Sequence, residues 1–154
     1  MIGNKTPILY IKSFTVYSMS FLYLVVGIKH FTNPSFFEAI VPPILIYTKT
    51  IVYISGFVEI LVAILILFKK TRKVGAYITI ALLVAVFPAN IYLYLSETPR
   101  ELLNFTKNQA LIRMPFQIPL IIIAYWHSLK VSSKSFSIIT CILFIPTIIY
   151  FINI

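Results

Sequence analysis

Long apolar stretches alternate with short polar connections along the chain. Each stretch is close to the ~20 residues that an α-helix needs to cross ~30 Å of hydrocarbon. No ten-residue segment shows the inward and outward alternation typical of an outer-membrane barrel. The pattern therefore predicts five membrane helices, over Ser13–Phe31, Lys49–Phe68, Val74–Leu95, Leu111–Leu129 and Phe136–Ile154.

The last stretch differs from the other four. Pro146 interrupts it, and Asn153 is its only strongly polar side chain. A peripheral spanning helix is favoured over a segment that lies along the membrane interface, but both stay open. The predicted fold is all-α: an integral membrane four-helix bundle over residues 1–130, followed by an additional fifth transmembrane helix over 131–154.

Composition supports a membrane protein. The 154 residues are 60% hydrophobic, with a mean hydropathy of +0.96, whereas soluble domains are about 45–50% apolar. The single cysteine, Cys141, excludes an internal disulfide and a Cys-x-x-Cys redox pair. The net charge of +9 is mostly the basic excess of one membrane side, so we expect contact with the lipid bilayer and no nucleic-acid partner.

The basic residues predict an orientation. The turn between the second and third stretches holds Lys69, Lys70, Arg72 and Lys73 with no acid. Lys5, Lys12, Lys130 and Lys134 fall on the same side, whereas the other side mixes five basic residues with Glu38, Glu97 and Glu101. The positive-inside rule then places the N-terminus of this multi-pass protein in the cytoplasm.

Glu59 lies in the middle of the apolar run Ile51–Phe68. An ionisable group at that depth costs several kcal/mol unless it is protonated, paired or facing water, so it is a candidate functional residue. Helical rise from the predicted membrane surfaces brings polar groups of four helices into the outer half of the membrane. We expect them to converge in a polar pocket open to the outer face, lined by His30, Glu59, Asn90, Arg113 and Gln117.

Helical spacing supports this convergence. Ser20, Tyr23, Gly27 and His30 form one stripe of the first helix, and Gly56 lies beside Glu59 on the second. Small residues in such stripes permit close approach of helix backbones.

Each pocket residue also has a purely structural interpretation. Arg113 could extend to lipid headgroups, His30 could lie at the interface, and Asn90 and Gln117 could simply bond across helices. Glu59 could pair with Arg113 as a strut, although bridging through Gln117, water or a ligand is favoured. His127, beside Tyr125 and Trp126, is interpreted as part of an aromatic belt at the cytoplasmic surface.

Prolines add two local expectations. Pro42 and Pro43 break any regular helix over 32–48, and an amphipathic piece over Ser35–Ile40 could lie across the pocket mouth. Pro88 removes the hydrogen bond to the carbonyl of Val84 and should kink the third helix just before Asn90.

Several motifs together resemble a known family. They are GIKHF at 27–31, IVPP at 40–43, SGFVEI at 55–60, VFPANIY at 86–92 and RMPFQ at 113–117. This ordered string is similar to the DoxX-like family of small bacterial four-helix membrane proteins, over about Ser13–Lys130. The resemblance implies a multi-pass protein of the bacterial cytoplasmic (inner) membrane. It would be related to a subunit of thiosulfate:quinone oxidoreductase, or to factors that help other membrane proteins to assemble.

Two functions follow, with a third as a weaker alternative. The favoured one is an accessory or assembly subunit whose pocket binds a lipid, a quinone or a helix of a membrane or periplasmic partner. The alternative is a quinone-binding subunit of a membrane oxidoreductase of the thiosulfate:quinone oxidoreductase type, and the third is a small transporter. Glu59 is the best candidate for a catalytic residue, and a quinone is the only cofactor suggested, since no haem, flavin, iron–sulfur or metal motif is present. Turnover and homo-oligomerisation stay open.

Overall fold

The computed structural model describes residues 7–152, which form helices and no strand. This confirms the all-α prediction. The helices are α1 (Pro7–Thr32), α2 (Pro34–Ala39), α3 (Thr48–Leu67), α4 (Arg72–Leu95), α5 (Glu97–Leu102), α6 (Lys107–Arg113), α7 (Gln117–Ser128) and α8 (Lys134–Ile152).

Five helical stretches are long and apolar enough to cross a membrane: α1, α3, α4, the combined α6 and α7, and α8. The membrane-bundle prediction is therefore confirmed, including the added C-terminal helix. The described part of the first helix already includes Pro7, six residues before the predicted start at Ser13.

The predicted fourth helix, Leu111–Leu129, is not continuous. It begins earlier, at Lys107, where Thr106 and Gln109 form a capping box that satisfies the first backbone N–H groups. It is then interrupted between Arg113 and Gln117. Pro115 explains the break in the hydrogen-bonding pattern, because it has no N–H to donate, although Met114 before it keeps αR backbone angles.

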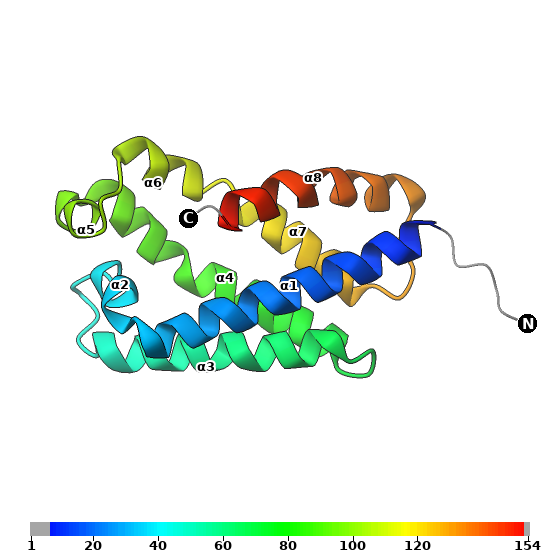
Figure 1. The fold of residues 1–154 in the computed structure, drawn as a ribbon, viewed down its shortest axis with the longest axis horizontal. Coiled ribbons are helices and arrows are strands. Elements are labelled where there is room, and N and C mark those ends of the chain that lie inside the picture. The colour runs from blue at the N-terminus through cyan, green and yellow to red at the C-terminus, as the bar shows by residue number, and fades with distance from the viewer. Residues whose placement is uncertain (1–6, 153–154) are drawn as a thin grey trace, which may run out of the picture.

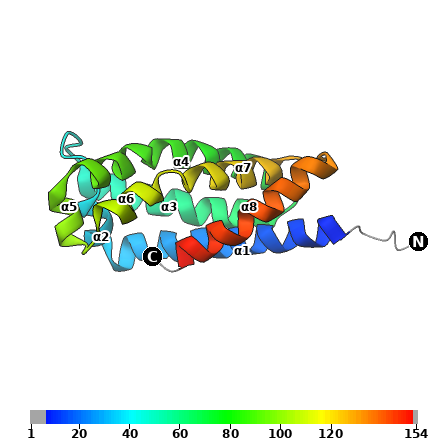
Figure 2. The ribbon, with the colours of Figure 1, turned by 90° about the horizontal axis from the view of Figure 1, so that it is seen from above.

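The bundle has two distinct ends (Figure 1). The basic end holds the start of α1, the α3–α4 turn and the α7–α8 connection. The opposite end is covered by the short helices α2 and α5. Neighbouring helices pack in the order α1, α3, α4, α7 and α8, and α8 also contacts α1. Figure 2 shows α4 and α7 running side by side on one face of this bundle, with α1 on the other.

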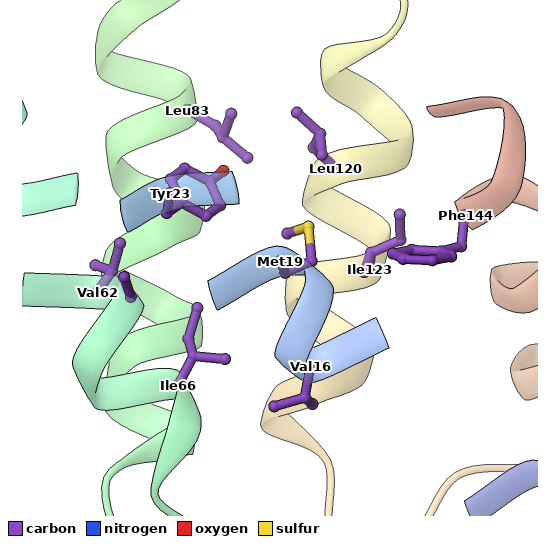
Figure 3. Packing of buried hydrophobic residues seen from close by; sticks show 10 residues of the cluster. Val16, Met19, Tyr23, Val62, Ile66, Leu83, Leu120, Ile123 and Phe144 are labelled. Carbon is purple, nitrogen blue, oxygen red and sulfur yellow. The ribbon is translucent and has the colours of Figure 1, made fainter. Parts of the chain in front are cut away.

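Apolar side chains fill the space between these helices. Val16, Met19 and Ile66 are fully buried, and Met19 lies between α3 and α7 (Figure 3). Phe144 of α8 belongs to the same cluster, so the added helix packs into the bundle rather than lying apart from it. The predicted polar stripe of α1, Ser20, Tyr23, Gly27 and His30, is buried as expected.

Two of the three arginines hold helix ends in place. Arg72 donates to the carbonyls of Ile66 and Leu67 at the end of α3. Arg100 does the same for α4, through the carbonyls of Leu93, Tyr94 and Ser96. Such bonds satisfy the last carbonyls of a helix, which have no partner within it.

Candidate functional site

The candidate site is built on a very close contact between α1 and α3. A Cβ atom added to Gly27 would lie 2.8 Å from Cγ1 of Ile60 and 2.9 Å from the carbonyl oxygen of Gly56. A Cβ atom added to Gly56 would overlap the Cβ of His30. Only glycine permits this approach of the two backbones, which brings the side chains one turn further along each helix into contact.

His30 and Glu59 meet at this contact. Nδ1 of His30 lies 3.1 Å from Oε2 of Glu59, and the two side chains are 7% and 12% exposed. Nδ1 also lies 2.9 Å from the carbonyl oxygen of Val26. A carbonyl can only accept, so Nδ1 carries a proton and donates it there. Glu59 Oε2 is close to the imidazole but makes no hydrogen bond within residues 7–152.

A short helix covers this pair. The piece expected over Ser35–Ile40 is α2, and its Phe37 ring stacks on the His30 imidazole, with ring centroids 3.5 Å apart and planes inclined by 21°. Phe36 of α2 in turn contacts Phe105, beyond α5. The imidazole is therefore held between the α1–α3 contact and an aromatic cover.

Other buried oxygens near the middle of the bundle have unused hydrogen-bonding capacity. Within residues 7–152, the hydroxyl of Tyr23 and Oε1 of Gln117 have no hydrogen-bond partner, like Glu59 Oε2. Tyr23 interacts electrostatically with Glu59, and its hydroxyl points toward Leu83 in Figure 3. Buried polar atoms are normally bonded, so each of these oxygens is a point where a polar group could be received.

Gln117 connects α7 to α4. Its Nε2 donates to the carbonyl oxygen of Leu83 over 3.3 Å. Helix α4 continues through Pro88 to Leu95 without a break. The sequence drew attention to the Val84 carbonyl, which Pro88 leaves without its helical hydrogen bond. The carbonyl that accepts from the Gln117 amide is instead that of Leu83.

Among the five predicted residues, His30 and Glu59 are the two that contact each other through a hydrogen bond or ion pair within residues 7–152. Asn90 is buried, with 6% exposure, and makes no hydrogen bond within residues 7–152. Arg113 is partly buried and contacts neither Glu59 nor Gln117 through a hydrogen bond or ion pair in that range. The alternative in which Glu59 pairs with Arg113 is thus wrong in this structure: the partner of Glu59 is His30.

A second buried polar cluster lies at the basic end of the bundle, away from the predicted pocket. Thr15 donates its hydroxyl to the Lys12 carbonyl and so accepts from Nε2 of His127, 2.9 Å away. Lys12 extends its ammonium to the Leu129 carbonyl and over the Trp126 ring. His127 Nδ1 is buried without a partner in the described residues.

The aromatic-belt interpretation of His127 and Trp126 is wrong. Trp126 is 0% exposed and His127 2% exposed, and only Tyr125, at 43%, faces outward. The cause is α8, whose first turns cover α7: the Trp126 indole donates to Ser132, which bonds Ser137.

Nothing in the described residues forms a metal-binding group of three His, Cys, Asp or Glu side chains. No curated protein and no solved structure matches the chain. A family model described as "Domain of unknown function (DUF8561)" matches residues 19–128, which include the whole α1–α3 site and end before α8. This match leaves the resemblance to the DoxX-like family untested. The chain is a member of the family of that domain of unknown function, DUF8561.

Proposed function

We propose that this protein is an accessory membrane subunit that binds the polar head of a small amphiphile, a quinone or a lipid, beside His30 and Glu59. The observation that carries the proposal is the carboxylate oxygen of Glu59. It lies in an apolar helix, 3.1 Å from an imidazole nitrogen, yet it makes no hydrogen bond within residues 7–152. Burying a charged or polar group at such a place costs free energy. Its presence there therefore indicates a role in ligand binding or proton transfer.

The neighbouring atoms offer complementary chemistry. Nδ1 of His30 carries a proton, so in the neutral form of the ring Nε2 is an acceptor for a hydroxyl group. The Tyr23 hydroxyl can donate to a carbonyl oxygen, and Glu59 can accept or release a proton. A quinone presents carbonyl oxygens when oxidised and hydroxyls when reduced, so this set fits both forms.

The resemblance to the DoxX-like family favours a quinone, and hence a subunit of a membrane oxidoreductase of the thiosulfate:quinone oxidoreductase type. A partner helix that inserts a polar side chain would use the same atoms. The transporter alternative receives no support, because Val16, Met19, Ile66 and Trp126 are fully buried between the two polar regions. The basic residues at the start of α1 and in the α3–α4 turn support an N-terminus in the cytoplasm and a place in the bacterial inner membrane.

Binding can be tested on purified protein in lipid nanodiscs, with short-chain ubiquinone and menaquinone analogues as probes. We expect wild type to bind one of them and Glu59→Gln to bind it about tenfold or more weakly, because a hydrogen bond to a charged group is worth ~1.5–3 kcal/mol. Tyr23→Phe should weaken it less.

Glu97→Gln is the matched control, since it makes the same chemical change at the exposed start of α5. Equal binding by wild type and Glu59→Gln would refute the site. Mass spectrometry of the molecules that co-purify with the protein then identifies the ligand class. The ligand is the lipid, quinone or protein that wild type retains and Glu59→Gln loses.

A further inference from the structure

A groove lies away from the His30–Glu59 pair, between the α6–α7 break and α8. It encloses about 280 Å³ and is lined by Pro115, Phe116, Pro119, Leu143, Pro146 and Thr147. Thr147 is the only polar residue in this wall, and its hydroxyl is already used by the Leu143 carbonyl, 2.7 Å away. The groove therefore offers an apolar surface that suits hydrocarbon.

One charged side chain near this groove, Arg113, has no hydrogen-bond or ion-pair partner within residues 7–152. Arg72 and Arg100 each bond backbone carbonyls, whereas Arg113 makes no hydrogen bond or ion pair within residues 7–152. Arg113 is nevertheless partly buried, at the end of α6. A guanidinium removed from bulk water gains most from an anion that accepts two parallel hydrogen bonds, as phosphate and carboxylate do.

Tyr150 links Arg113 to the groove. Its ring stacks on Phe116 of the groove wall, with centroids 4.2 Å apart and planes inclined by 12°. It also interacts electrostatically with Arg113, and its buried hydroxyl has no partner in the described residues. A cation and a free hydroxyl thus lie next to one wall of an apolar groove.

The depth of Arg113 suits a lipid headgroup. The membrane-spanning stretch Lys107–Ser128 begins six residues before Arg113, which corresponds to roughly 9 Å of helical rise. Arginine side chains at that depth can reach the headgroup region.

We propose that this groove is a binding site for an anionic phospholipid, with an acyl chain along Phe116, Leu143 and Pro146 and the phosphate at Arg113 and the Tyr150 hydroxyl. Helix α8 supplies half of the site and lies outside the residues that the family model matches. The site would thus be a property that α8 adds to the bundle. It is independent of the proposed function, because Arg113 and Glu59 form no ion pair.

The test is binding of dioleoyl phosphatidylglycerol to the full chain in detergent, followed by native mass spectrometry and by thermal stabilisation. We expect wild type to retain one lipid, and Arg113→Gln to bind it about tenfold more weakly. Leu143→Trp should lose binding by filling the groove, and Tyr150→Phe should weaken it without changing charge or ring stacking. Lys107→Gln, which removes one charge from exposed α6, should bind like wild type.

Three outcomes would overturn the proposal. The first is unchanged binding by Arg113→Gln and Tyr150→Phe, and the second is unchanged binding by Leu143→Trp. The third is stabilisation by inorganic phosphate equal to that by phosphatidylglycerol. That result would show that Arg113 binds an anion and that the groove binds no acyl chain. Each variant is first checked for native helix content by circular dichroism, and Tyr150→Phe serves as the second variant if Arg113→Gln does not fold. Arg113→Gln should still bind the quinone analogue, which separates this site from the one at His30.

Discussion

His30 of α1 and Glu59 of α3 lie in contact because two glycines bring their helices together. The imidazole Nδ1 is 3.1 Å from the carboxylate Oε2, and the Cβ of His30 occupies the space that a side chain on Gly56 would need. The ion-pair distance is therefore a consequence of backbone packing rather than of long flexible side chains. Changing the packing should change the pair.

Gly56→Ala is the direct test of that dependence. The added methyl group must push α1 and α3 apart at His30, and overpacking of this kind costs typically ~1–3 kcal/mol of unfolding free energy. We expect a lower melting temperature in detergent and weaker binding of the quinone or lipid. The control is Ile54→Ala, two residues away, whose side chain is 59% exposed. It should leave ligand binding unchanged. A variant with wild-type stability and binding would show that the helices are not held this closely.

Glu59→Gln should separate ligand binding from stability. Glu59 Oε2 makes no hydrogen bond in the described residues, so we expect the amide to cost ~1 kcal/mol or less in unfolding free energy while binding is lost. Chemical or thermal unfolding in detergent measures the first effect. A loss of ~3–5 kcal/mol, as for a broken buried ion pair, with rescue by His30→Gln but not by Arg113→Met, would instead make the pair a structural strut.

Much of the site was visible in the sequence because membrane helices have simple rules. The spacing of Ser20, Tyr23, Gly27 and His30 correctly gave the buried stripe of α1, and Glu59 stood out inside an apolar run. Depth along a helix follows from a fixed rise per residue. The fixed rise does not reveal which helices are neighbours. That arrangement determines whether Glu59 contacts His30 or Arg113.

The error about Arg113 has a specific cause. Its depth was counted along one straight helix over Leu111–Leu129, but the chain breaks between α6 and α7. Arg113 ends the first piece and associates with Tyr150 on α8, a helix outside the predicted four-helix bundle. A break of this kind does not change the hydrophobic pattern that predicts the span.

The orientation in the membrane is open to direct measurement. In a background with Cys141→Ser, a cysteine at Ser35 on exposed α2 should react with a membrane-impermeant maleimide in intact cells. A cysteine at Lys70, in the exposed basic turn, should react only after permeabilisation, because the basic end is expected on the cytoplasmic side. The reverse pattern would move the His30–Glu59 site to the cytoplasmic half of the membrane.

The buried contact between Thr15 and His127 predicts a stability effect far from the candidate site. Thr15→Val keeps the shape of the side chain but removes the acceptor for the His127 Nε2 proton, 2.9 Å away. Both ring nitrogens are then buried without partners, because Nδ1 already has none in residues 7–152. An unsatisfied buried polar group costs ~1–3 kcal/mol, so we expect a clearly lower melting temperature in detergent.

Two further variants decide the cause of that loss. Ser13→Ala, which removes an exposed hydroxyl bonded to the Leu9 carbonyl, should change the unfolding free energy by less than ~0.5 kcal/mol. Thr15→Val combined with His127→Leu should recover part of the loss, because replacing both partners of a buried hydrogen bond by apolar groups can be nearly neutral. If the double variant is less stable than Thr15→Val alone, His127 must contribute through contacts other than Thr15, such as its stacking on Trp126.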